Sequence, residues 1–160
     1  MTEEVKIPEL VKEMDDQMKE VPVFYNKETG EYIGVREQFL HYVEAGFQLK
    51  DFSSDEERTE FKLAKEILTT DKYLRIPTNY DIYEWEIIID FTREVEDEEI
   101  RNDLLDAINA DNPFHKFKEK ILRHDVSRDW FRFKRNRFAE IAKYWCEGQK
   151  IGYKETEESD

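Results

Sequence analysis

Two side chains of opposite charge could carry chemistry in this chain, because each interrupts an apolar helical pattern. Glu84 falls among the apolar positions of NYDIYEWEIIIDFTREV, and Arg137 falls among those of DWFRFKRNRFAEIAKYW. An unpaired buried guanidinium group is costly, so we expect a partly buried Glu84–Arg137 ion pair between two helices. A backbone carbonyl is the alternative partner for Arg137. In a catalytic interpretation, Glu84 or Asp90 is instead the working carboxylate of a small hydrolase or transferase.

A second group of residues has the composition of a binding surface. Tyrosine and arginine are favoured where proteins bind partners, and KYLRIPTNYDIYEWE contains Tyr73, Arg75, Tyr80 and Tyr83. These side chains could line a groove for a peptide or a small ligand. Alternatively, they lie at the edge of the core and join the two halves of the chain.

The sign of the charge reverses in the segment 114–143. This segment holds ten lysine and arginine residues and four carboxylates, a net charge of +6, so the rest of a chain with net charge −14 carries −20. A basic segment with interleaved aromatic residues is typical of a strip that contacts phosphates and stacks bases. The nucleic-acid hypothesis requires one exposed face formed by Lys116, Lys118, Arg128, Arg132 and Arg135.

Helical periodicity favours a different role for the aromatic residues of this segment. At about 100° per residue, they gather into one broad arc, which we expect to be the buried face of the last helix. Stacking residues would have to be exposed, so we expect the core interpretation, with Arg128, Arg132 and Arg135 among the outward cations. The arc consists of Trp130, Phe131, Phe133, Phe138, Ile141, Ala142, Tyr144 and Trp145.

Metal and nucleophile chemistry has little support in the sequence. His41, His115 and His124 lack the spacing of metal ligands, and the five glycines form no phosphate-binding loop. Cys146 is the only cysteine, so we expect a buried, unreactive thiol and no disulfide within the chain. We expect no catalytic residue, no metal and no cofactor.

The composition is that of a folded, acidic protein. Of the 160 residues, 40% are charged and 39% hydrophobic, but 14% are aromatic, and aromatic side chains bury large apolar areas. We expect a single domain over residues 1–152 and a disordered tail over 153–160. The lone cysteine and the acidic N-terminal segment favour the cytoplasm, with no membrane association.

The pattern of apolar residues predicts an α+β fold with a mostly helical C-terminal half. Pro8 opens a short N-terminal helix, and NKETG connects the strands of a hairpin. Ser53 or Ser54 caps a later helix, and KYLRIP is extended. Four helices follow, at about 80–95, 98–110, 113–123 and 127–147.

Four segments together resemble the uncharacterised bacterial protein family UPF0158. They are VKIPELVKEM, FYNKETGEYIGV, KYLRIPTNYDIYEWEIIIDF and FHKFKEKILRHDVSRDWFRFKRNRFAEIAKYW, and the resemblance covers residues 4–148. It implies a small soluble bacterial protein, but no reaction, cofactor or catalytic residue. In the family we expect a glycine-rich turn before the FKF helix, where this chain has Asn112-Pro113.

The leading hypothesis for the function is a non-enzymatic protein-interaction or regulatory module with a protein partner. Nucleic-acid association through the segment 114–143 is the first alternative, and a hydrolase or transferase that uses Glu84 or Asp90 is the second. A negative field of this size repels nucleic acid and anionic membranes on average, which favours the leading hypothesis.

Overall fold

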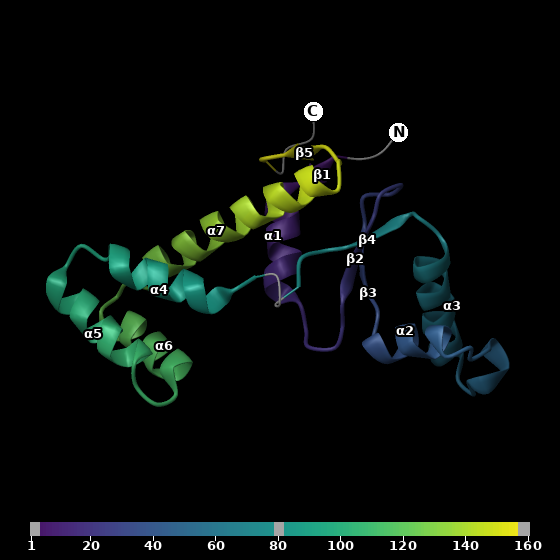
Figure 1. Ribbon diagram of the computed structural model, residues 1–160, viewed down its shortest axis with the longest axis horizontal. Coiled ribbons are helices and arrows are strands. Elements are labelled where there is room, and N and C mark those ends of the chain that lie inside the picture. Colours follow the sequence, from purple (N-terminus) through teal and green to yellow (C-terminus); the bar gives the residue numbers. More distant parts are fainter. Residues whose placement is uncertain (1–3, 79–81, 157–160) are drawn as a thin grey trace. The chain divides into compact units, whose positions relative to one another are not determined.

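The computed structural model describes residues 4–78 and 82–156 and confirms the α+β fold with a mostly helical C-terminal half (Figure 1). The chain forms two compact units. Unit 1 comprises Met1–Thr78 and Ala142–Asp160, and unit 2 comprises Asn79–Ile141. The single domain stays a prediction. Within the described ranges, no helix has the length and apolar composition needed to cross a membrane.

The elements follow the predicted order. Those of unit 1 are β1 (Val5–Lys6), α1 (Ile7–Asp16), β2 (Val23–Asn26), β3 (Tyr32–Gly34), α2 (Glu37–Glu44), the 3-10 helix η1 (Leu49–Asp51), α3 (Asp55–Thr69), β4 (Tyr73–Arg75) and β5 (Tyr153–Lys154). Those of unit 2 are α4 (Glu84–Glu94), α5 (Glu98–Ile108) and α6 (Pro113–Arg123), while α7 (Ser127–Gly148) begins in unit 2 and ends in unit 1.

The predicted hairpin is part of a three-stranded antiparallel sheet with the strand order β3-β2-β4. In the turn, the side-chain oxygen of Asn26 accepts hydrogen bonds from the backbone N–H groups of Glu28 and Thr29, at 2.9 and 3.2 Å. Gly30 follows with a φ of 78°, a conformation that glycine adopts without steric cost. The local chemistry of NKETG therefore closes the hairpin.

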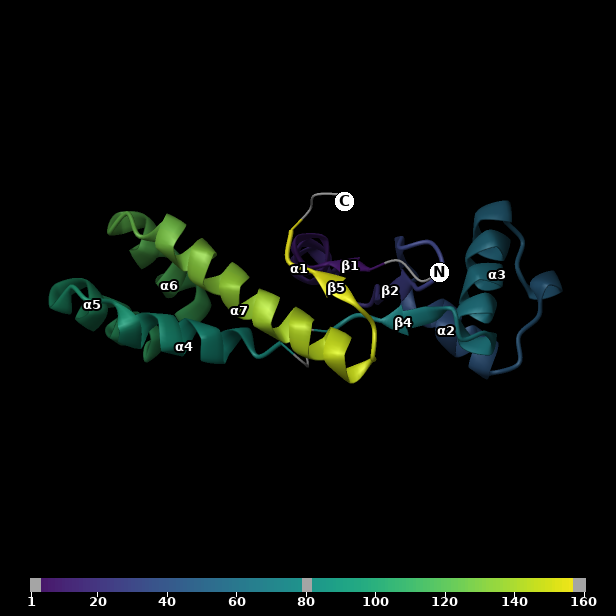
Figure 2. The same ribbon diagram turned by 90° about the horizontal axis from the view of Figure 1, so that it is seen from above.

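Helices α2 and α3 lie side by side in unit 1 (Figures 1 and 2). The second of the two serines predicted as a cap begins α3, because Ser54 Oγ accepts a hydrogen bond from the N–H of Glu57 at 3.1 Å. The two helices share a core with the sheet. Its buried members are Phe24, Val35, Phe39, Leu40, Phe52, Phe61, Ala64 and Ile67.

The short strands β1 and β5 pair in parallel, with Val5 opposite Tyr153. Residues 153 and 154 of the predicted tail form this strand. The tail itself stays a prediction, and residues 157–160 lie outside the described ranges. The N–H of Val5 donates to the carbonyl of Gly152 at 2.9 Å, and Val5 is 1% exposed. A buried backbone N–H needs a partner, and the C-terminal segment supplies it.

Unit 2 contains the helices that position the candidate site. Asp97 caps α5, since its carboxylate accepts a hydrogen bond from the N–H of Ile100 at 3.1 Å. Helices α5 and α6 pack against each other. Between them Asn112 has a φ of 51°, at the place where the resemblance led us to expect glycines. Asparagine tolerates this left-handed conformation, so Asn112 supplies the backbone geometry of a glycine turn, and Pro113 starts α6.

The buried face of α7 differs from the predicted single arc. Trp130, Phe138 and Cys146 are buried, but Phe131 is 54% exposed and Tyr144 is 79% exposed. Positions four residues apart advance by about 40° around a helix with 3.6 residues per turn. The buried positions therefore wind around α7 along its length. The prediction was wrong for Phe131 and Tyr144 because it assumed one straight face with one set of neighbours.

Candidate functional site

Three helices of unit 2 bring aromatic side chains together. The ring centroid of Phe91 on α4 lies 5.4 Å from that of Trp130 and 5.5 Å from that of Phe133, both on α7. Phe117 on α6 lies 5.1 Å from Trp130, with an interplanar angle of 83°. Side chains three residues apart project from the same side of a helix, as Trp130 and Phe133 do. These edge-to-face contacts form a rigid aromatic cluster.

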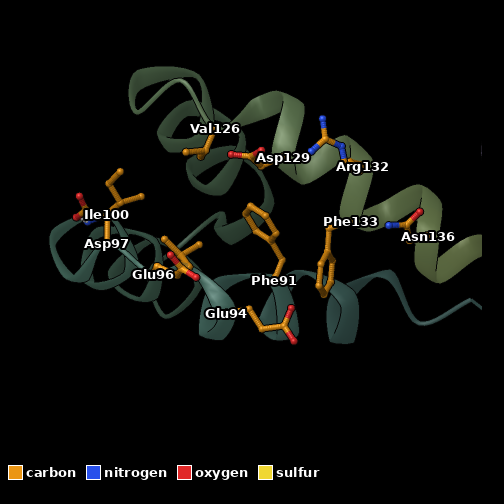
Figure 3. Close-up of a pocket in the computed structure, with 11 residues that line it drawn as sticks. Phe91, Glu94, Glu96, Asp97, Ile100, Val126, Asp129, Arg132, Phe133 and Asn136 are labelled. Carbon is orange, nitrogen blue, oxygen red and sulfur yellow. Dashed lines mark hydrogen bonds between the residues drawn. The ribbon is translucent and has the colours of Figure 1, made fainter.

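A hollow of about 470 Å³ opens beside this cluster. Figure 3 shows the rings of Phe91 and Phe133 between α4 and α7, and Ile100 and Val126 extend the apolar part of the lining. We call this site the acidic hollow, because most of its charged lining residues are carboxylates. The full lining consists of Phe91, Glu94, Val95, Glu96, Asp97, Ile100, Val126, Asp129, Arg132, Phe133 and Asn136.

The charges of the acidic hollow are unbalanced. Glu94, Glu96, Asp97 and Asp129 line it, and Arg132 is the one cation among its lining residues. All five side chains are exposed. In Figure 3 the guanidinium group of Arg132 points away from the rings of the cluster. The hollow therefore presents an apolar surface inside a negative local potential, and this combination suits a ligand with a cation on an apolar stem.

Glu84 and Arg137 have other partners than the predicted ones. A guanidinium nitrogen of Arg137 donates to Asp90 Oδ2 at 2.8 Å, while Lys134 Nζ lies 3.2 Å from Glu84 Oε1. Helical periodicity places Asp90 on the polar side of α4, away from the apolar positions around Glu84. The arginine side chain is long enough to extend past the apolar face to that flank. Glu84, the first residue of α4, instead pairs with Lys134.

The predicted tyrosine and arginine groove stays a prediction. Tyr73 and Arg75 belong to β4 in unit 1, Tyr83 precedes α4 in unit 2, and Tyr80 lies outside the described residues. Tyr73 packs against the core of unit 1, which is what the core-edge alternative requires of it. Arg75 forms a long ion pair with Glu37, at 3.7 Å, and Tyr83 is 66% exposed.

The outward cations of α7 lie where the sequence places them. Arg128, Arg132 and Arg135 are all exposed. On α6, Lys118 is exposed and Lys116 is half-buried. The three arginines recur at intervals of four and three residues, so they share one side of α7. Whether the two lysines of α6 belong to the same face stays a prediction.

Sequence reasoning missed a polar cluster between α5 and α6. Asp103 Oδ2 lies 2.6 Å from His124 Nε2, and Lys120 Nζ lies 3.0 Å from Asp103 Oδ1. The hydrogen bond with His124, followed by that with Lys120, lowers the pKa of Asp103 below its ordinary range. Because 21 positions separate Asp103 from His124, no local pattern announces the contact. The cluster links two helices and is distinct from the acidic hollow.

Cys146 is buried, as predicted. Burial raises the pKa of its thiol to about 11. Since the thiolate is the nucleophilic form of cysteine, this side chain is poorly reactive at neutral pH. Among the residues with described positions, histidine, cysteine and carboxylate side chains form no group of three suited to holding a metal ion.

Comparison with known proteins connects this structure with one family. The family model described as "Uncharacterised protein family (UPF0158)" matches residues 10–160. UPF0158 protein PA5073 of Pseudomonas aeruginosa is 33% identical over 63 residues, which span 39% of this chain and 41% of that protein's own length. No solved structure matches the chain. The family match extends over both units, and on this basis the chain belongs to the uncharacterised protein family UPF0158.

Proposed function

We propose that this protein is a non-enzymatic protein-interaction or regulatory module that acts in the cytoplasm, and that the acidic hollow binds a basic segment of a partner protein. The observation that carries the proposal is the pairing of the Phe91 and Phe133 rings with four exposed carboxylates around one opening. Lysine and arginine have apolar stems and charged ends, so a single side chain of either type satisfies both parts of the lining.

The expected interaction is modest in strength and sensitive to salt. Each exposed carboxylate contributes about 0.2–1 kcal/mol to an ion pair, and a cation over an aromatic ring adds about 0.5–1 kcal/mol at an exposed site. Apolar side chains of the partner that flank the cation would cover Ile100 and Val126. A basic amphipathic segment therefore fits better than a polar one of equal charge.

A peptide titration tests this proposal. The probe is a labelled peptide of about 15 residues with alternating lysine and leucine pairs, and its control is a peptide in which serine replaces leucine. We expect the leucine peptide to bind more tightly and the variant Glu94→Gln/Glu96→Gln to bind it about three- to tenfold more weakly. The matched variant Glu98→Gln/Glu99→Gln changes neighbouring carboxylates that do not line the hollow. Equal loss in both variants would contradict a defined site.

The same variants connect the site to partners in bacterial lysate. The expected partners are proteins that bind the wild type and the Glu98→Gln/Glu99→Gln control but do not bind the Glu94→Gln/Glu96→Gln variant. Capture at high salt identifies those held by apolar contacts as well as by charge. Retention that is identical for all three forms would count against the acidic hollow as the binding site.

The catalytic alternative has less support from the geometry. It assigns the catalytic carboxylate to Glu84 or Asp90. Each of these forms an ion pair with a cation of α7, Glu84 with Lys134 and Asp90 with Arg137. If an activity is found, unchanged rates in Glu84→Gln and Asp90→Asn would eliminate this alternative.

A further inference from the structure

Three arginines of α7 form an exposed row, and no described carboxylate lies within ion-pair distance of them. We call the surface of Arg128, Arg132 and Arg135 the arginine face. Across residues 4–78 and 82–156, none of the three has an ion-pair partner within 4.0 Å. Their neighbours Lys134 and Arg137 on the same helix do have such partners. The chain carries 39 carboxylates and 25 lysines and arginines, so a row of unpaired arginines is unexpected.

An exposed aromatic ring lies next to this row. Phe131 is 54% exposed and is three residues from Arg128 and four from Arg135, the two spacings that make neighbours on a helix surface. Helical periodicity assigned every aromatic residue of α7 to the core, which argued against stacking on bases. The exposure of Phe131 removes that argument. Trp130 and Phe138 supply the buried positions, so Phe131 is not needed to cover the cluster.

The arginine face has the length and the chemistry of a phosphate-binding strip. Seven residues of helix span about 10 Å, so the three guanidinium groups are close enough together to contact the phosphates of neighbouring nucleotides. The planar guanidinium group forms paired hydrogen bonds with phosphate oxygens. Negative charge more than about 8–10 Å away is attenuated at ordinary ionic strength, whereas the carboxylates of the acidic hollow lie close to Arg132.

We propose that the arginine face of α7 binds the phosphates of a single-stranded nucleic acid and that Phe131 stacks on one of its bases. An acidic protein segment would supply anions, but it would not require the exposed ring. A duplex keeps its bases stacked within the helix, whereas a single strand has a free base to place on Phe131. This site is distinct from the acidic hollow, although Arg132 belongs to both.

The test is fluorescence anisotropy with labelled single-stranded RNA of about 12 nucleotides, measured over a series of salt concentrations. If three cations contact phosphates, a plot of log K against log salt should have a slope of about −2, from −0.7 for each neutralised phosphate. The variant Arg128→Gln/Arg132→Gln/Arg135→Gln should abolish this slope and lower the affinity at least tenfold. The variant Lys12→Gln/Lys62→Gln/Lys65→Gln removes the same charge from exposed positions of unit 1 and should bind almost as well as the wild type.

Phe131→Ala separates stacking from charge. It should weaken RNA binding about fivefold or more and leave the salt slope unchanged. Tyr144→Ala removes another exposed aromatic residue of α7 and should have no effect. All of these positions are exposed, and circular dichroism should show that each variant keeps the wild-type helix content.

Three outcomes would overturn the proposal. The first is no RNA binding at about 25 mM salt, where electrostatic attraction is strongest. The second is tighter binding to polyglutamate than to RNA with no effect of Phe131→Ala, which would assign the face to an acidic protein. The third is self-association of the protein in sedimentation that the triple arginine variant abolishes, while RNA binding persists in that variant. This result would assign the arginine face to a second copy of this chain.

Discussion

The course of the buried face along α7 is tested by truncating two phenylalanines of the same helix. Phe138 is 4% exposed and Phe131 is 54% exposed, and both lie in unit 2. The substitutions Phe138→Ala and Phe131→Ala remove the same atoms and change the helix propensity equally. Any difference in the free energy of unfolding therefore reports the difference in burial.

The expected costs follow from these exposures. Phe→Ala in a core costs about 3–5 kcal/mol, and Phe138 also loses the cation of Lys134, which lies 5.4 Å from its ring centroid. Phe131 buries about half of its side chain, worth about 1 kcal/mol, and the gain in helix propensity from alanine is the same in both variants and cancels. We therefore expect Phe138→Ala to be less stable than Phe131→Ala by about 3 kcal/mol.

Urea unfolding followed by circular dichroism measures this difference. At a slope of about 1–3 kcal/mol per M, the midpoint of Phe138→Ala should lie about 1 M or more below that of Phe131→Ala. If Phe138→Ala does not fold, Phe138→Leu keeps most of the volume and should cost about 1.5 kcal/mol. Equal midpoints for the two alanine variants would refute the winding buried face, and with it the free aromatic surface beside the arginine face.

Three further predictions concern titration, ion pairing and thiol reactivity. The hydrogen bond with His124 holds the pKa of Asp103 below its ordinary value of 3.8. This carboxylate therefore stabilises the fold above about pH 4 and ceases to do so as the pH falls through its lowered pKa. The urea midpoints of wild type and Asp103→Asn should differ at neutral pH and converge in acid. A double-mutant cycle of Asp90→Asn and Arg137→Gln should give a coupling free energy of about 0.5–1 kcal/mol, since the two side chains are 40% and 33% exposed. This coupling should shrink at about 1 M salt, and zero coupling at low salt would contradict the ion pair. The thiol of Cys146 should react slowly with a disulfide reagent in the native protein and quickly in concentrated guanidinium chloride, and rapid native labelling would show that it is not buried.

Local interactions explain why much of the fold can be predicted from the sequence. Ser54 finds its hydrogen-bond donor three residues along the chain, Asn26 closes its turn within three residues, and Pro113 has the backbone geometry that suits the first position of a helix. The α+β fold, the hairpin and the four C-terminal helices all follow from such patterns. The grouping of Arg128, Arg132 and Arg135 on one side of α7 also follows, because helical spacing places these residues together.

The contacts that build the candidate site depend on tertiary structure. Arg137 meets Asp90 rather than Glu84 because the placement of the helices decides which carboxylate a long side chain reaches. The pairing of Val5 with Tyr153 joins the two ends of the chain, and no nearby residue signals it. Phe131 remains exposed because the buried positions wind around α7. Sequence periodicity shows which residues share a side of a helix, whereas the neighbouring elements determine which side is buried.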